Sequence, residues 1–418
     1  MDGNQGGRRK PGWVRDARVA IGCLIVLAAM PGCRDDAAGP EPAAPEDTTA
    51  SPGLVTVALG TAERVMQYRL ESCEEYDLPD VQARAFRRAD GTLVLVSGNA
   101  PLNYWMAGSG FDDLTRVCQP VLESGDDPEA DTFDNQEWIT SVYREGGVVH
   151  ALVHNEYHDP FAPNCRPGDT SPANPCWYNA VTYARSTDGG RTFSQLRPPA
   201  HVVAAPPARW DPVTVRGAPG PYGYFSPSNI VRGPDGVHYA VLFGIPHRDR
   251  QGERGACVMR SANLSDPSGW QAWDGGAYSI RMPSPYVSDG TPACAFVSQA
   301  EIQDLHGSLT YNDYLKRWIL VGSSIASASG AVACGDYFSL SRDLIHWTPK
   351  QLLRPVKLPN AACGAGPEGS EIYPSLIDHA DTTVNYERTG RRPHLYYVRW
   401  NQGLNRDLWR VPLTFDLR

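Results

Sequence analysis

Three titratable side chains alternate in the stretch HNEYHD, residues 154–159. The stretch follows the apolar run VVHALV, so we expect it to end a buried strand. Alternate side chains of a strand share one face, which groups His154, Glu156 and His158. Asn155 and Tyr157 then point the other way. The three grouped side chains could form a metal site, a carboxylic acid whose pKa the imidazoles tune, or a solvated loop mouth.

The metal alternative requires more ligands than this strand supplies. Zinc accepts imidazole nitrogen and carboxylate oxygen, and two His plus one Glu would leave one position open. Ligands at alternate positions of a single strand are far apart for one ion, so a further ligand would be needed. Asp159 offers an oxygen ligand to calcium or another divalent ion instead. We therefore assign no metal and expect no cofactor, with a structural divalent ion as the alternative.

The composition predicts a large domain of short strands. The chain has 418 residues, of which 41% are hydrophobic and 20% charged, and it contains 40 Gly, 36 Pro and 11 Trp. Helical periodicity is hard to find, which favours strands joined by turns. The formal net charge is −9 and no basic stripe occurs, so nucleic acid is not an expected partner.

Residues 1–32 have the composition of a targeting segment. A basic start precedes the apolar stretch VAIGCLIVLAAMPG, which is shorter than the ~20 residues that span a bilayer. The stretch leads to Cys33 in AAMPGC and resembles a bacterial lipoprotein signal, which implies lipidation of Cys33; an ordinary secretory signal is the alternative. The resemblance implies an exported protein at the cell membrane or outer membrane, facing the periplasm or the exterior. Residues 33–53, rich in Pro, Ala and acids, predict a flexible tether before a folded domain at 54–418.

Eight cysteines follow the two of the leader, an even number that predicts disulfides in an exported chain. Cys257 and Cys334 each stand 13 residues before a tryptophan, and the next cysteine after each lies in a long connector. These spacings predict the pairs Cys257–Cys294 and Cys334–Cys363. Cys165–Cys176 would close the loop after HNEYHD, and Cys73–Cys118 would then remain as the fourth pair.

A strand, a tight turn and a second strand recur five times after residue 80. The copies are VQARAFRRADGTLVLVSG, WITSVYREGGVVHALVHN, SNIVRGPDGVHYAVLFG, SLTYNDYLKRWILVGS and PSLIDHADTTVNYERTGRRPHLYYVR. A second hairpin follows each copy, and repeated four-stranded units that cannot bury both sheet faces alone predict a β-propeller. We predict an all-β, five-bladed β-propeller to which LVTVA at 54–58 adds a closing strand. A six-bladed propeller and a split barrel plus sandwich are the alternatives.

The second hairpins carry a family resemblance. In STDGGRTF, Ser186, Asp188, Gly190 and Phe193 resemble the Asp-box of sialidase-type propellers. The Ser and Asp side chains can bond the amides of their own turn, Gly supplies a conformation that other residues resist, and the ring packs between strands. SRDLIHW at 341–347 lacks the glycine and is similar to hairpins of five-bladed arabinanase, xylosidase and fructosidase propellers. These motifs mark a fold rather than a reaction.

The long connectors gather on one face of the predicted ring. The connector into each blade and the loop after its second strand share a face, whereas the short turns RADG, REGG and GPDG lie on the other. The connectors at 197–225, 274–306 and 355–373 are long, and long ordered loops are usually functional. The long-connector face is therefore the candidate site.

Carboxylates and aromatic rings are expected to converge on that face. They come from the starts of inner strands and from the end of the strand at 148–158, and they comprise Asp80, Arg84, Glu137, Trp138, His154, Glu156, Tyr157, His158, Ser228, Asn229, His306, Glu371 and Tyr373. Aromatic faces suit sugar rings, and glycosidic hydrolysis needs one carboxylic acid and one ionised carboxylate.

The resemblance to the five-bladed hydrolases implies roles for the carboxylates. In those enzymes an aspartate that opens blade one is the base, and Asp80 matches it by position. Glu156 is the preferred acid because the flanking histidines can tune it, and Glu137 and Glu371 come next. We predict a monomeric glycoside hydrolase-like propeller for an extracellular or cell-envelope glycan. A carboxyl separation of ~6.5–9.5 Å would indicate inversion and ~5–5.5 Å retention.

Structural roles remain open for each residue. Asp80 could simply pair with Arg84, and the HNEYHD set could anchor a loop. A glycan- or protein-binding propeller without catalysis is the competing class, because a fold does not determine a reaction. A sialidase is less well supported, since it needs several arginines around a carboxylate. The sequence contains no GxSxG or GxxxxGK[ST] motif.

Overall fold

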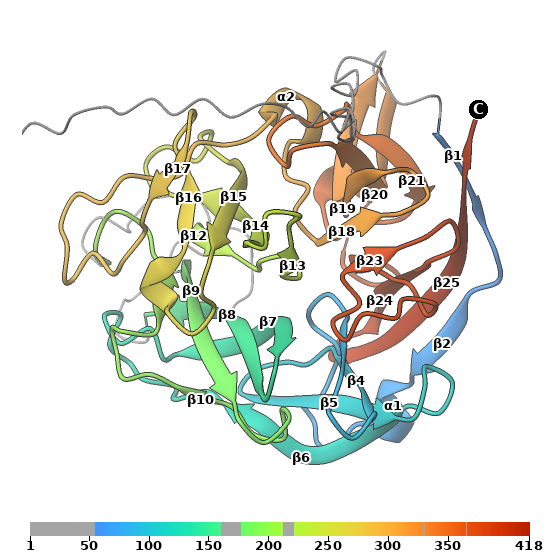
Figure 1. The fold of residues 1–418 in the computed structure, drawn as a ribbon, viewed down its shortest axis with the longest axis horizontal. Coiled ribbons are helices and arrows are strands. Elements are labelled where there is room, and N and C mark those ends of the chain that lie inside the picture. The colour runs from blue at the N-terminus through green and yellow to red at the C-terminus, as the bar shows by residue number, and fades with distance from the viewer. Residues whose placement is uncertain (1–54, 160–176, 212–220, 329–330, 365) are drawn as a thin grey trace, which may run out of the picture. The chain divides into compact units, whose positions relative to one another are not determined.

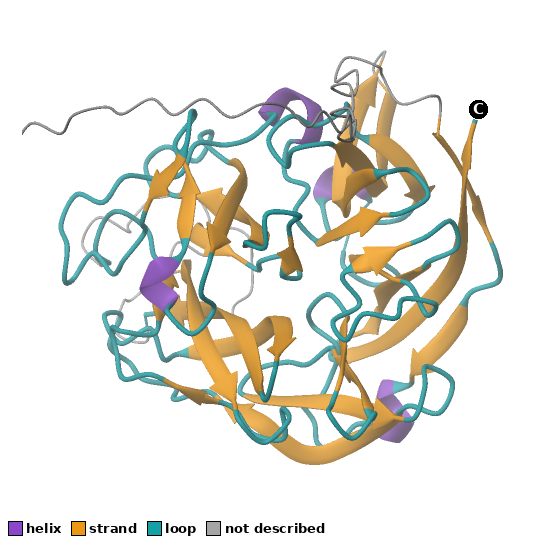
Figure 2. Ribbon diagram, in the orientation of Figure 1, coloured by secondary structure: helices purple, strands orange, loops and turns teal. Residues whose placement is uncertain are grey.

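The computed structural model describes residues 55–159, 177–211, 221–328, 331–364 and 366–418, and these residues are almost entirely strands and turns (Figures 1 and 2). Helix within these ranges is limited to α1 (Tyr68–Glu71), α2 (Gln299–Ile302) and the 3-10 turns Pro267–Gly269 and Ala361–Cys363. Over the same ranges, no helix has the length and apolar character that crossing a membrane requires.

The described strands form four sheets, and the eleven-stranded one joins two antiparallel groups through the parallel pairing of β9 (Trp177–Ser186) with β12 (Tyr222–Phe225). The five successive groups that result are here called blades one to five (Figure 1). Blade one contains β3 (Arg84–Arg87), β4 (Leu93–Val96), β5 (Leu102–Gly108) and β6 (Thr115–Glu123). Blade two contains β7 (Gln136–Glu145), β8 (Val148–His158), β9 (Trp177–Ser186), β10 (Ser194–Gln195) and β11 (Val202–Ala204). Blade three contains β12 (Tyr222–Phe225), β13 (Val231–Arg232), β14 (His238–Ile245), β15 (Gly255–Ser261), β16 (Gln271–Trp273) and β17 (Tyr278–Ile280).

Blade four contains β18 (Ser308–Asn312), β19 (Arg317–Ala328), β20 (Ala331–Ser341) and β21 (Gln351–Pro355). Blade five contains β22 (Glu371–Ile377), β24 (His394–Gln402) and β25 (Asn405–Leu417), and its outer edge is formed by β1 (Val55–Leu59) and β2 (Glu63–Met66). β1 pairs antiparallel with β25, and Val55 lies opposite Leu417. The prediction that the first strand adds to the last blade is therefore confirmed.

The inner strands of neighbouring blades lie side by side. β3 contacts β7, β13 contacts β18, and β22 contacts both β18 and β3. The Ile230 amide donates to Ser141 Oγ at 2.9 Å and links blade three to blade two. The prediction of an all-β propeller is therefore confirmed, while the number of blades in the whole chain stays a prediction.

The hydrophobic core is divided among the contacts between adjacent blades. Phe86 and Trp105 of blade one, for example, pack in one cluster with Val149 and Phe193 of blade two. The alternating pattern of each strand supplies apolar side chains for both sheet faces, and each blade needs its neighbour to cover them.

Arg84, on the first inner strand, hydrogen-bonds to the backbone of blades two, three and four and does not line the cavity among the long connectors. Its guanidinium donates to the carbonyl oxygens of Gly307 at 2.7 Å, Thr140 at 3.0 Å and Pro227 at 3.4 Å. Arg84 is 4% exposed, and burial lowers its pKa to about 9. The prediction that Arg84 binds substrate or pairs with Asp80 is wrong, because backbone carbonyls of blades two, three and four occupy its donors.

The connector between β22 and β24 bonds to the inner strands of the other blades near the residues where those strands end. Its segment 381–389 accepts backbone N–H bonds from Arg87 of blade one, Arg144 of blade two and Arg232 of blade three. β23 (Arg388–Thr389), within this segment, pairs in parallel with β18 of blade four. This one segment of blade five therefore bonds to each of the other four blades.

The turn at 186–193 makes the contacts expected from its sequence. Ser186 Oγ accepts the Gly190 amide at 2.8 Å, and Asp188 Oδ1 accepts the amides of Arg191 and Thr192 at 2.8 and 3.0 Å. Gly190 has a φ of 80°, which suits a residue without a Cβ.

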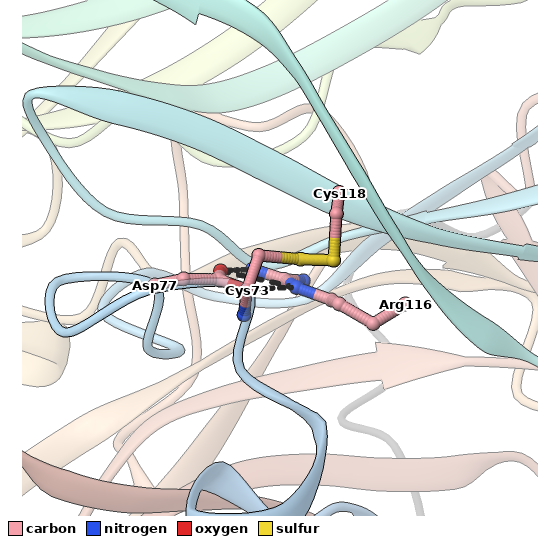
Figure 3. The surroundings of a disulfide bond; sticks show 4 residues. All are labelled: Cys73, Asp77, Arg116 and Cys118. Atoms are coloured by element: carbon pink, nitrogen blue, oxygen red, sulfur yellow. Dashed lines mark hydrogen bonds and ion pairs between the residues drawn. A yellow bond between two sulfur atoms is a disulfide. The ribbon is translucent and has the colours of Figure 1, made fainter.

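Three of the predicted disulfides are present, Cys73–Cys118, Cys257–Cys294 and Cys334–Cys363, and the proposed pair Cys165–Cys176 lies outside the described residues. Figure 3 shows the first of them beside the ion pair of Asp77 with Arg116. The disulfide and the ion pair both attach the segment before Asp80 to β6. Disulfides form and persist in oxidising compartments, so these bonds indicate an exported protein.

Candidate active site

A cavity of about 1220 Å³ lies where connectors into several blades meet. Seven of the side chains predicted for the site line it, namely Asp80, Trp138, His154, Glu156, Tyr157, His158 and Tyr373. Residues that the sequence analysis did not select complete the wall, including Asp126, Asp127, Asn135, Gln136, Trp177, Ser226, Asn360, Pro367, Trp400 and Arg406. The ring thus brings residues of blades one, two and five to one hollow.

Glu156 lies between the two histidines of its own strand. Its carboxylate oxygens are 2.9 Å from His154 Nε2 and 3.3 Å from His158 Nε2. Burial by itself raises the pKa of Glu156, but the histidine bonds outweigh burial and lower the pKa to about 2. The histidines tune Glu156 as predicted, but toward the ionised form. Glu156 therefore does not suit the predicted role of general acid, and it does suit a base, a nucleophile or a stabiliser of positive charge.

The pairing of β7 with β8 explains which side chains face the cavity. Gln136 is opposite Glu156 and Trp138 is opposite His154. Directly opposed residues project from the same side of a sheet, so these four side chains form one wall. The Trp138 indole donates to Asn99 Oδ1 at 2.8 Å, which holds the ring 5.9 Å from His154.

Asp80 forms an ion pair with Arg406 of β25 at the wall of the cavity. The Arg406 guanidinium stacks on the Trp400 ring at 3.9 Å from its centroid, and burial lowers the pKa of Arg406 to about 10. The Asp80 amide also donates to the Gly98 carbonyl at 3.1 Å, so both its backbone and its carboxylate are fixed. The sequence analysis expected Asp80 at this site but missed its partner.

Indole rings on two sides of the cavity were not selected from the sequence. Trp177 begins β9, with its ring 5.4 Å from His158, and Trp400 lies near the end of β24. A tryptophan at a strand end on the long-connector face is the signal that could have identified both.

The connector from β21 to β22 supplies the wall at Asn360 and Pro367. Cys334–Cys363 attaches the middle of this connector to β20, and the Glu371 amide donates to the Lys357 carbonyl at 2.9 Å where the connector ends. A disulfide and backbone bonds therefore fix this part of the cavity.

Glu137 faces away from the cavity. It is 1% exposed, its Oε1 accepts from Gln195 Nε2 at 2.6 Å and from Thr182 Oγ1 at 3.4 Å, and burial raises its pKa to about 8. Glu137 follows Gln136 and precedes Trp138, and neighbours along a strand point to opposite faces. The prediction that both Glu137 and Trp138 line the site is wrong for Glu137.

Glu371 is an ion-pair centre between blades four and five. Its carboxylate accepts from Arg354 Nη1 at 2.5 Å and from Arg399 Nε at 2.9 Å, and Arg354 also bonds Asp336 at 2.8 Å. Glu371 does not line the cavity. Its predicted catalytic role is therefore replaced by a structural one.

Asn229 and His306 are also structural. Asn229 exchanges hydrogen bonds with the backbone of Leu309, at 2.5 and 2.8 Å, and so joins blade three to blade four. His306 stacks on Phe243 with centroids 5.4 Å apart, and its Nδ1 lies 2.6 Å from the Asp304 carbonyl. Neither residue lines the cavity, so both predictions of substrate contact are wrong.

No group of three or more His, Cys, Asp or Glu among the described residues has the arrangement of a metal site. The histidine Nε2 atoms are directed at Glu156. Asp159 Oδ2 accepts from the Trp210 indole at 2.9 Å.

No protein-family model matches the chain, and no curated protein matches it. An α-L-arabinofuranosidase from Lactobacillus brevis is 12% identical, with a TM-score of 0.47 over 83% of this chain and 94% of its own. An α-L-arabinanase from Cellvibrio cellulosa, solved with arabinohexaose, is 11% identical, with a TM-score of 0.42 over 79% and 91%. A Dyadobacter fermentans protein of unknown function is 12% identical, with a TM-score of 0.44 over 85% and 99%. Likeness at this level does not indicate an activity.

Proposed function

We propose that the protein is a glycoside hydrolase that acts on an extracellular or cell-envelope glycan. The observation that carries this proposal is one cavity that places the carboxylates of Asp80 and Glu156 among indole rings. Indole faces suit the apolar faces of sugar rings, and ionised carboxylates stabilise the positive charge that develops at the anomeric carbon.

Glu156 is the ionised carboxylate of the proposed reaction. With its pKa at about 2, it stays charged at neutral pH and is ready to take a proton from water or to attack the anomeric carbon. Asp80, held by Arg406, is the second carboxylate at the reacting bond. The choice between inversion and retention depends on the separation of these two groups once substrate is bound.

The test is hydrolysis of a panel of envelope polysaccharides and 4-nitrophenyl glycosides by the purified exported chain. Glu156→Gln should lower kcat by about 10²–10⁴-fold on whichever glycan the wild type cleaves. It should leave the Kd of that glycan within a few-fold, measured by calorimetry. Glu145→Gln, at the other end of β7 and half exposed, is the matched control and should match wild type.

A glycan- or protein-binding propeller without catalysis is the second candidate. One observation favours it: Asp80 and Glu156 already have protein partners, Arg406 for Asp80 and two histidines for Glu156. Retention of a polysaccharide in affinity electrophoresis, with no product from any glycan in the panel, would establish this second function and exclude the first.

Membrane attachment through a lipid on Cys33 is part of the proposal. The leader and the tether at 33–53 support it, and both lie outside the described residues. Expression with an alkyne fatty acid should label the wild type but not Cys33→Ser, which should move to the soluble fraction. Labelling that survives this substitution would contradict lipidation at Cys33.

A further inference from the structure

Tyr373 is turned into the cavity by an irregular stretch of β22. The pairing of β22 with β24 shifts register between Ile372 and Ser375, so the strand bulges at this tyrosine. Tyr373 has a φ of 58°, in the left-handed region that aromatic residues rarely adopt. Such a conformation is strained and tends to occur at functional sites, where the surrounding structure imposes it.

The Tyr373 hydroxyl has no protein hydrogen bond within the described part of the chain. Tyr157, the other tyrosine at the cavity, donates its hydroxyl to the Pro128 carbonyl at 3.0 Å. Burial and the negative charge of Glu156 both raise the pKa of Tyr373. The phenol therefore keeps its proton at neutral pH and is an available donor in the cavity that Glu156 also lines.

Other ionisable side chains at the cavity already have partners. Asp126 Oδ1 accepts from Gln136 Nε2 at 2.8 Å, and Asp127 Oδ1 accepts the Glu129 amide at 2.9 Å. Glu156 is ionised, and Asp80 is paired with Arg406. His154 and His158 direct Nε2 at Glu156, and their Nδ1 atoms are buried away from solvent. The Tyr373 hydroxyl is the tyrosine donor of this cavity that no described protein group engages.

We propose that Tyr373 is a further catalytic residue, which gives the leaving oxygen its proton; the inference rests on the hydrolase function proposed above. The bond between the anomeric carbon and the leaving oxygen breaks, and that oxygen takes the bond's electron pair and the phenol proton. Water adds to the anomeric carbon and loses its proton to Glu156 or Asp80. Solvent then carries that proton back to the Tyr373 phenolate, so the protein ends in its starting state.

The test compares two glycosides of one sugar that the wild type cleaves, the 4-nitrophenyl glycoside and the methyl glycoside. A nitrophenolate leaves without a proton, whereas methoxide needs one. Tyr373→Phe keeps the ring and removes the donor. It should lower kcat on the methyl glycoside by about 10²–10³-fold and on the 4-nitrophenyl glycoside by less than about 5-fold.

Tyr311→Phe is the matched control, because Tyr311 lies on β18 outside the cavity and should behave as wild type on both substrates. Equal losses of Tyr373→Phe on the two glycosides, or no loss on either, would overturn the donor role while the hydrolase function stands. A wild type that cleaves neither glycoside nor any glycan of the panel would overturn the hydrolase function and the donor role with it.

Discussion

Asp80 and Arg406 are 326 residues apart in the sequence and form an ion pair at the cavity wall. Asp80 precedes the first inner strand, and Arg406 belongs to the last strand of the final blade. The pair exists only when blade five lies against blade one. The cavity is therefore completed by closure of the ring.

Removing the arginine should destabilise the fold. Arg406→Met leaves the Asp80 carboxylate without its partner, and side chains in this pair are only 11% and 18% exposed, so a loss of about 2–4 kcal/mol is expected. Asp80→Asn combined with Arg406→Met should recover part of that loss, because no charge then remains unpaired. Urea denaturation measures each variant, and additive losses in the double variant would show that the two residues do not interact.

Glu137 should make the folded protein less stable as pH rises. Its pKa is about 8 when folded and 4.5 ordinarily, so the folded state holds the proton over that interval. Stability is then lost as pH rises from about 5 to about 8, by on the order of 3–5 kcal/mol. Glu137→Gln keeps a neutral side chain and should lose far less stability between pH 5 and 9. The same pH dependence of stability in wild type and Glu137→Gln would show that Glu137 is not its source.

Glu371 should matter for folding rather than for turnover. Glu371→Gln weakens the bonds to Arg354 and Arg399 and should lower the free energy of unfolding by about 2–4 kcal/mol. Well below its melting temperature, the variant should keep kcat within a few-fold of wild type. Glu156→Gln should show the reverse pattern, so the two variants measured together separate the two roles.

His379 should make the protein sensitive to acid. Its ring stacks on His394 at 3.7 Å and on Phe111 at 4.0 Å, and burial, with the neighbouring charges of His394 and Arg410, lowers its pKa to about 3 from 6.5. As pH falls, the unfolded chain takes up a proton at this histidine before the folded protein does. The free energy of unfolding therefore decreases as pH falls from about 7 toward 3.

His379→Phe should remove about 1–2 kcal/mol of the stability difference between pH 7 and pH 5, measured by urea denaturation at each pH. The lost bond to the Tyr396 hydroxyl is a constant offset that does not change with pH. An unchanged difference between the two pH values would rule out His379 as the source.

The part of the candidate site that lies on a regular strand was predictable, because alternate side chains of a strand share one face. His154, Glu156 and His158 come from one regular strand, so alternation placed them together. The same rule excludes Glu137 once Trp138 faces the cavity, because adjacent side chains diverge. Cys257–Cys294 and Cys334–Cys363 were also predictable, since Cys257 and Cys334 hold matching positions in successive blades.

Other parts of the site depend on contacts that no local pattern encodes. The partner of Asp80 lies 326 residues away on the last strand. Glu371 and Tyr373, two residues apart, would share a face in a regular strand. The register shift after Ile372 separates them, leaving Glu371 between two arginines and Tyr373 in the cavity. A bulge of this kind is set by the packing around it.

The segment 381–389 has a consequence for how the ring comes apart. A blade in a simple stacked array can fray while distant repeats stay folded, because each repeat touches only its neighbours. Here one stretch of blade five holds the inner strands of all the others through hydrogen bonds. Detaching any blade disturbs the anchor shared by the rest, so the ring should open as a single cooperative event and not by successive loss of blades.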